Sequence, residues 1–307
     1  MRCHSYRRAP PVAKNLLPGT KIGVYSGMLH LAVRNMIHVV VAGVACAVIL
    51  VGLHAAERRA SRYLAWRLGW RSVRLTGWLG VPIHEFSHLV AAKIFGHRVI
   101  AWKLYDPDPV SGTLGYVRHG YRRRSAWQIL GTFPIAIAPV VGGGCALLAL
   151  SLVIFGADFA RVWAAAWQHA AAAGEILAQG ALGSGIAHLA ASGRILARGI
   201  WQSPTPWWPV GAYAGVAIST HLAPSYADLR GGWPGGLALT AAALLGAAIL
   251  AALGINAAAV FLLPTALGVV ALVAMVGQGS YVTLVALAFF WRRKRSRRHV
   301  SGRAPSG

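Results

Sequence analysis

The chain has 307 residues, of which 56% are hydrophobic and only 12% are charged, whereas a soluble domain carries about 25% charged residues. The net charge of +23 is a property of many nucleic-acid-binding proteins, but the long apolar runs exclude that class. The composition predicts a polytopic α-helical membrane protein whose basic residues lie mainly between and beyond its spans.

The first apolar run follows a basic tail, residues 1–35. Met36 to Leu53 is eighteen residues with one polar side chain, which is long enough to approach a bilayer span. This run is too long for the apolar region of a signal peptide, so we expect the span, 36–54, to be retained. Residues 57–74 carry six Arg interleaved with aromatic residues and Leu, a pattern typical of an interfacial helix.

A second span, 75–96, and a β-hairpin, 97–124, are predicted next. Two β-prone runs, Val99–Tyr105 and Thr113–Val117, flank the sequence Asp106-Pro107-Asp108-Pro109. Pro and Asp residues in such a cluster are a strong turn signal. We therefore predict a small hairpin that is associated with the membrane.

The rest of the chain is predicted to complete one membrane domain, 36–291, with six transmembrane helices. The remaining spans are 126–155, 206–222, 235–253 and 257–291, with Ala-rich short helices at 157–205, a polar loop at 221–236 and a basic tail at 292–307.

The distribution of Arg and Lys predicts the orientation, because cytoplasmic loops are enriched in both. The two basic tails and the hairpin, 97–124, are then cytoplasmic, and the segment 157–205 is extracytoplasmic. Residues 57–74 conflict with this topology because their six Arg would lie outside. The excess of Arg over Lys, with abundant Ala and Gly, indicates a bacterial protein, so we expect it in the bacterial cytoplasmic membrane.

The second span contains His84, Glu85 and His88 in the pattern H-E-x-x-H. Residues i and i+4 lie on one face of a helix, so the two imidazoles can bind one metal ion. Glu85 can act as the general base that activates the attacking water and then protonate the leaving amine. Ionisable side chains inside a span are costly, which favours a functional site over histidines that only hydrogen-bond neighbouring helices.

A catalytic zinc ion needs a third protein ligand, and two candidates follow the fourth predicted span. Asp228 lies after Pro224, which can turn the chain back towards the membrane, and His221 lies seven residues earlier. Asp228 could instead cap a helix or pair with Arg230, and His221 could be an interfacial histidine. We favour Asp228 because a carboxylate in a membrane loop is the costlier residue to keep.

These patterns resemble the site-2 protease family of intramembrane zinc metalloproteases over roughly residues 75–232. The matching features are His84-Glu85-x-x-His88, the hairpin after it, Ala138-Pro139-Val140-Val141-Gly142 in the next span, and Pro224-x-x-x-Asp228-x-x-Gly231. The resemblance implies that the first motif supplies two zinc ligands and the general base, and that an Asp supplies the third ligand. It also implies a site that opens near the cytoplasmic face.

Three features depart from the family pattern. Two residues separate Asp228 from Gly231, where the family usually has Asp followed directly by Gly, and Gly142 stands where Asn is common. No PDZ domain is recognisable, and residues 157–205 occupy its topological place. We therefore expect a divergent member of the family.

The expected function is zinc-dependent intramembrane endopeptidase activity, with Glu85 as the catalytic residue and Zn²⁺ held by His84, His88 and Asp228. The expected partners are a membrane-protein or peptide substrate and the lipid bilayer, with no nucleic acid, and the oligomeric state is open. The alternative is a non-enzymatic membrane transporter or scaffold that uses the histidines to bind a metal or a partner. A zinc enzyme that hydrolyses a lipid or another amide is a further alternative.

Overall fold

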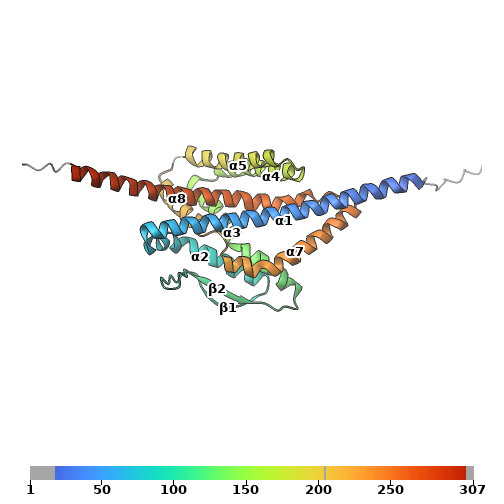
Figure 1. Cartoon of the computed structure of the whole chain (residues 1–307), viewed down its shortest axis with the longest axis horizontal. Coiled ribbons are helices and arrows are strands. Elements are labelled where there is room, and N and C mark those ends of the chain that lie inside the picture. The colour runs from blue at the N-terminus through green and yellow to red at the C-terminus, as the bar shows by residue number, and fades with distance from the viewer. Residues whose placement is uncertain (1–17, 204, 302–307) are drawn as a thin grey trace, which may run out of the picture.

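The computed structural model describes residues 18–203 and 205–301, with side chains described within 26–288 except at 178, 204 and 258. The described residues form long helices and one small antiparallel sheet (Figure 1). The elements are α1 (Pro18–Leu68), α2 (Trp70–Ile94), β1 (Arg98–Lys103), β2 (Tyr116–Gly120), α3 (Ala126–Phe155), α4 (Phe159–Ala178), α5 (Leu182–Gln202), α6 (Trp208–Ser219), α7 (Tyr226–Ala252), the 3₁₀ helix η1 (Ala258–Phe261) and α8 (Leu262–Ser301).

Four described helices are long and apolar enough to cross a membrane, by length and composition. The candidate spans are Ser26–Leu68, Ala126–Phe155, Tyr226–Ala252 and Ala259–Ala288. This confirms the helical, membrane-suited character and the small hairpin, but the prediction of six spans is not confirmed. The helix that carries H-E-x-x-H, α2, is not among the four.

α1 is one continuous helix where three separate segments were predicted. It begins at Pro18, inside the predicted tail, and continues to Leu68, through most of the predicted interfacial helix. The chain then breaks at Gly69, whose φ of 66° favours glycine. The first 17 residues of the N-terminal tail and residues 302–307 of the C-terminal tail lie outside the described residues.

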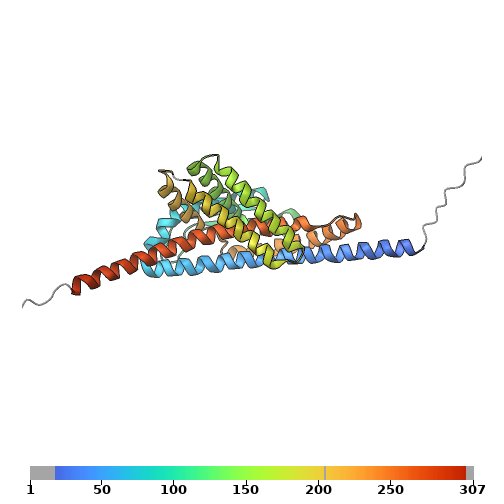
Figure 2. The ribbon, with the colours of Figure 1, turned by 90° about the horizontal axis from the view of Figure 1, so that it is seen from above.

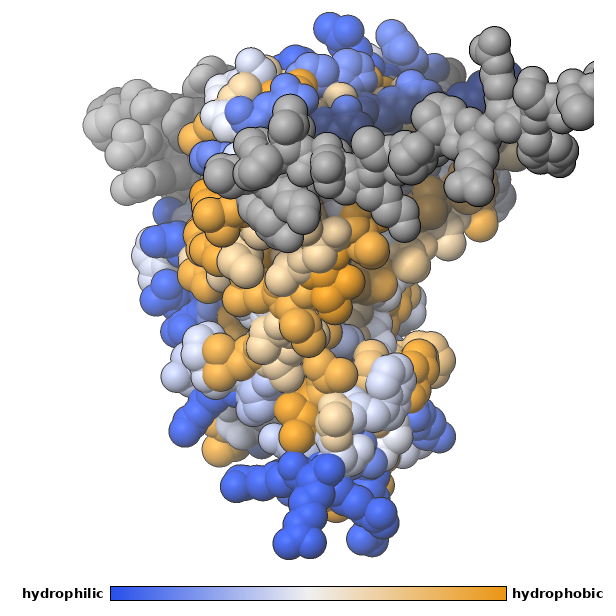
Figure 3. Space-filling view, turned by 90° about the vertical axis from the view of Figure 1, so that its right-hand side faces the viewer, coloured by the Kyte–Doolittle hydropathy of each residue, from blue (hydrophilic) through white to orange (hydrophobic). Residues whose placement is uncertain are grey.

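α1 is apolar on both its packed and its exposed faces in the stretch that was predicted to span the bilayer. The packed face carries Val39, Ala42, Cys46, Leu50 and Leu53, and the exposed face carries Val40, Val44, Val48 and Val51. The end view of the molecule likewise shows hydrophobic residues across its middle and hydrophilic residues above and below (Figure 3). A helix that is apolar all round is suited to a lipid environment.

α1 and α8 run side by side in the same direction. The rings of His38 and Phe261 lie 5.5 Å apart, and Ile49 lies beside Gly268. Pro18 and Ser301 consequently lie at opposite ends of the long axis (Figure 1). Two parallel helices that both cross a bilayer start on one side and end on the other, so this arrangement is at odds with the prediction that both termini are cytoplasmic.

α6 and α7 run in the same direction. The sequence had predicted two separate membrane crossings here, at 206–222 and 235–253. α6 runs parallel to α2, since Tyr213 hydrogen-bonds the Leu75 carbonyl and the Gly80 Cα faces the Ala217 carbonyl. α7 runs antiparallel to α3, which is itself antiparallel to α2. α6 and α7 therefore form one interrupted path through the bundle, with a break at residues 220–225.

The predicted short helices of 157–205 are α4 and α5, of 20 and 21 residues. They pack against each other and against α8 (Figure 2). They lie on the opposite side of the bundle from the β-hairpin (Figure 1). The hairpin folds back along α2, because Tyr105 near its turn donates a hydrogen bond to the carbonyl of Arg74.

Small residues set the close contact between α3 and α7. The amide of Gly235 donates to Thr132 Oγ1 over 2.7 Å, and a Cβ at Gly235 would lie 2.5 Å from that oxygen and 2.6 Å from the backbone nitrogen of Phe133. Glycine at such contacts lets helix backbones approach each other in a membrane. Gly231, which belongs to the predicted motif, has no atom near enough to meet an added Cβ, so it has no packing role here.

We predict that Gly235→Ala lowers the free energy of unfolding by about 1–3 kcal/mol, the usual cost of overpacking. Gly246→Ala is the matched control in the same helix, because a Cβ there would meet no atom within 4 Å. Thermal unfolding in detergent measures both variants. Equal melting temperatures for the two variants would contradict the close contact.

Candidate metal centre

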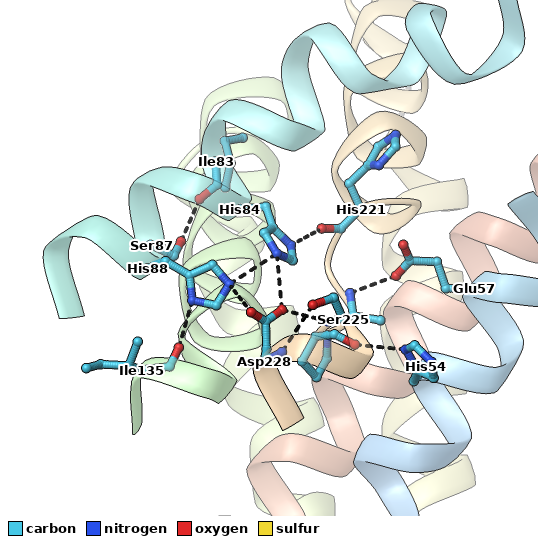
Figure 4. Close-up of polar contacts among 12 residues, drawn as sticks. His54, Glu57, Ile83, His84, Ser87, His88, Ile135, His221, Ser225 and Asp228 are labelled. Carbon is cyan, nitrogen blue, oxygen red and sulfur yellow. Dashed lines mark hydrogen bonds and ion pairs between the residues drawn. The ribbon is translucent and has the colours of Figure 1, made fainter. Parts of the chain in front are cut away.

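Three side chains from two helices converge at one point (Figure 4). His84 and His88 come from α2, and Asp228 comes from the first turn of α7. The two histidine Nε2 atoms are 3.2 Å apart, His88 Nε2 is 3.3 Å from Asp228 Oδ1, and His84 Nε2 is 3.8 Å from Asp228 Oδ2. Among the described residues this is the one group of three or more potential ligands whose donor atoms lie so close together.

The second nitrogen of each imidazole determines which tautomer is present. His84 Nδ1 lies 2.7 Å from the His221 carbonyl oxygen, and His88 Nδ1 lies 2.8 Å from the Ile135 carbonyl oxygen. A carbonyl oxygen can only accept, so both Nδ1 atoms must carry the proton. In the neutral rings the two Nε2 lone pairs then point at each other and at the carboxylate, which is the arrangement of metal-ligating histidines.

This donor set fits a zinc ion. Zinc–nitrogen bonds of about 2.05 Å in a tetrahedron place ligand atoms about 3.3 Å from one another, close to the two shorter distances observed. Without a cation, two lone pairs 3.2 Å apart would repel each other. Three protein ligands leave the fourth tetrahedral position free for chemistry.

Asp228 is held by the start of α7. Its Oδ2 accepts a hydrogen bond from the Ser225 amide at 2.7 Å, and its own amide donates to Ser225 Oγ at 3.2 Å. This reciprocal pair is a capping box. Asp228 therefore caps α7, the role considered from the sequence, and at the same time approaches the two histidines. Among the described contacts, the Asp228 carboxylate approaches the two histidines rather than Arg230.

Glu85 lies next to the ligand group and beneath the hairpin. Its side chain is 9% exposed, and its Cγ would lie 3.0 Å from a Cβ at Gly115, just before β2. The same Cβ would lie 2.8 Å from the Leu104 carbonyl oxygen. Glycine at 115 therefore allows the hairpin backbone to close over Glu85.

Two other residues that the sequence singled out have supporting positions. The His221 ring is turned to Thr76, with Nε2 3.0 Å from Thr76 Oγ1, so the ring is not part of the ligand group although its carbonyl supports His84. A Cβ at Gly142 would clash with Ser87 of α2. An Asn at 142 would meet the same side chain, so Ser87 accounts for the glycine at this position.

Two supporting residues on α1 were not singled out from the sequence. His54 Nδ1 lies 2.9 Å from the Pro224 carbonyl oxygen, and Glu57 Oε2 lies 3.0 Å from the Ala223 nitrogen. Both contact the segment that precedes Asp228. A signal was present, because Glu57 is one of only three Glu in the chain and directly follows the first apolar run.

A second histidine pair joins the hairpin to the start of α3. His97 Nε2 lies 2.7 Å from the Gln128 carbonyl oxygen and must donate to it, so His97 Nδ1 accepts from His119 Nδ1 at 2.9 Å. Burial and the neighbouring His97 lower the pKa of His119. This pair ties the hairpin to the helices around the centre.

Comparisons of the chain with protein-family models, with curated proteins and with solved structures find no match. The interpretation of the centre therefore rests on its own geometry, and membership of the site-2 protease family stays a prediction.

We predict about one zinc ion per polypeptide in detergent-purified protein, measured by elemental analysis. His84→Ala and Asp228→Asn should both lose it. The asparagine keeps an oxygen that can accept from the Ser225 amide but lacks the negative charge that favours a divalent ion.

Ser225→Ala is the control for that experiment, because it removes one capping hydrogen bond and leaves the carboxylate in place. We expect it to lower stability by about 0.5–2 kcal/mol and to keep zinc. Full zinc content in Asp228→Asn would contradict the role of Asp228 as a ligand.

Proposed function

We propose that this chain is a zinc-dependent membrane-embedded endopeptidase of the site-2 protease type. The observation that carries the proposal is the pair of imidazoles whose Nδ1 atoms face carbonyls. Their Nε2 atoms lie 3.2 Å apart and face Asp228 at 3.3 Å and 3.8 Å. Glu85, between the two histidines, supplies the carboxylate that hydrolysis requires. A centre that only held a structural ion would not need this additional buried acid.

The roles of the residues follow from their positions. His84, His88 and Asp228 would hold the ion, and a bound zinc ion supplies polarisation of the scissile carbonyl and acidifies the attacking water. Glu85 takes the proton from that water and passes it to the leaving amine. The surrounding apolar helices keep bulk water away from the reacting groups.

The hairpin provides a place for an extended substrate. Gly115 brings the backbone that leads into β2 against Glu85, and in a two-stranded sheet each strand keeps one unpaired edge. An extended peptide can add to such an edge by backbone hydrogen bonds. A membrane-protein segment bound in this way would pass close to the catalytic carboxylate.

Glu85→Gln should abolish cleavage and retain zinc. The carboxamide has nearly the same shape but cannot accept a proton, and loss of a general base typically costs about 10²–10⁴-fold in rate. The measurement is cleavage of a membrane-embedded reporter in vesicles or cells, with zinc content determined in the same preparations.

The alternatives predict other outcomes. A transporter or scaffold would keep metal transport or complex formation in Glu85→Gln and lose it in His84→Ala. A lipid or amide hydrolase would change the lipid profile without cleaving a protein. Unchanged proteolysis by Glu85→Gln would overturn the mechanism.

A further inference from the structure

The break between α6 and α7 leaves backbone polar groups without helical partners inside the bundle. Residues 222–225 are not helical, and Leu222, Ala223 and Pro224 are all buried. Non-helical backbone at membrane depth is tolerated only where the protein itself satisfies its hydrogen bonds. The partners of this segment are therefore part of the design of the centre.

Side chains from four helices satisfy these groups. Three side chains donate to backbone carbonyls: Gln278 of α8 to Ser219 (2.8 Å), His84 of α2 to His221 (2.7 Å) and His54 of α1 to Pro224 (2.9 Å). Two carboxylates accept from backbone amides: Glu57 of α1 from Ala223 (3.0 Å) and Asp228 of α7 from Ser225 (2.7 Å). Two of the five partners, His84 and Asp228, belong to the ligand group itself.

The geometry points to Glu57 and His54 as positioning residues for the metal centre. They lie three residues apart on the face of α1 that turns towards the segment (Figure 4). Between them they hold two consecutive residues, Ala223 and Pro224. This inference rests on the proposed function, because it concerns the same centre.

The effect reaches the ligands on both sides of the held segment. Upstream, the His221 carbonyl sets the tautomer and direction of His84. Downstream, Ser225 precedes α7, and its backbone amide holds the Asp228 carboxylate. A shift of Ala223 and Pro224 would therefore displace both the carbonyl that supports His84 and the backbone of Asp228.

The chemistry of each contact supplies a conservative replacement. Glu57 acts here as a hydrogen-bond acceptor, which a Gln side-chain oxygen can replace, and His54 acts as a donor, which an Asn side-chain nitrogen can replace. Alanine at either position removes the contact. We therefore compare Glu57→Gln with Glu57→Ala, and His54→Asn with His54→Ala. Each comparison tests the hydrogen bond itself rather than the identity of the residue.

Asn35 is the matched control, because it makes the same kind of contact on α1, about five turns before His54. It is fully buried, donates to the Ile255 carbonyl at 3.0 Å and accepts from the Ala257 amide at 3.0 Å. Asn35→Ala should loosen α1 against the α7–α8 connection without reaching the ligands.

The experiment measures zinc affinity of the full chain in detergent by competition with a chelator, and the visible spectrum of the cobalt(II)-loaded protein. We expect Glu57→Ala and His54→Ala to weaken zinc binding about 10- to 100-fold, the usual effect of losing an outer partner of a ligand, and to alter the cobalt spectrum. Glu57→Gln, His54→Asn and Asn35→Ala should stay close to wild type in both.

Wild-type affinity in folded Glu57→Ala would overturn the inference, as would equal weakening in Asn35→Ala or no rescue by Glu57→Gln. Wild-type protein that binds no zinc would overturn both this inference and the proposed function. Wild-type protein that binds zinc but cleaves no substrate would overturn the protease alone, because the affinity and cobalt measurements do not depend on cleavage.

Discussion

Hydrogen bonding of the interrupted α6–α7 path is the constraint on which the centre depends. A buried backbone amide or carbonyl without a partner costs about 1–3 kcal/mol, and this segment presents several within a few residues. Each partner comes from a side chain, so α1, α2, α7 and α8 are joined at one place. The same contacts that stabilise the break also orient His84 and Asp228. Stability and metal-ligand geometry therefore share one set of interactions.

Close helix packing brings together the helices that carry the metal ligands. Gly142 lets α3 approach Ser87 of α2, and Gly235 lets α7 approach Thr132 of α3. Ser87 directly precedes His88, and Gly235 lies two turns after Asp228. In a bilayer, where apolar surface gains little from helix association, such small-residue contacts and interhelical hydrogen bonds carry much of the packing.

Six of the seven acidic residues of the chain fall into two groups. Asp106 and Asp158 pair with Lys or Arg three residues away on the surface, and Asp108 accepts hydrogen bonds within the hairpin turn. Glu57, Glu85 and Asp228 instead lie in or around the metal centre, so three of seven acids are gathered there. In a chain so poor in acids, this concentration favours a role in binding or chemistry over solubility.

The sequence by itself determined the local features: the apolar helices, the hairpin between Val99 and Val117, and the shared helix face of His84 and His88. Each depends on periodicity or on turn chemistry within a short window. Asp228 could be singled out because a carboxylate near an apolar run is costly.

Only the tertiary structure decided how these pieces meet. Apolar runs show where helices occur but not their direction, so two predicted spans became one interrupted path, α6–α7, and α8 was found parallel to α1. The support from His54, Glu57 and the His221 carbonyl was also hidden, because these groups lie up to 170 residues apart along the chain. Their contacts exist because a break in a buried helix requires partners from whichever helices pack beside it.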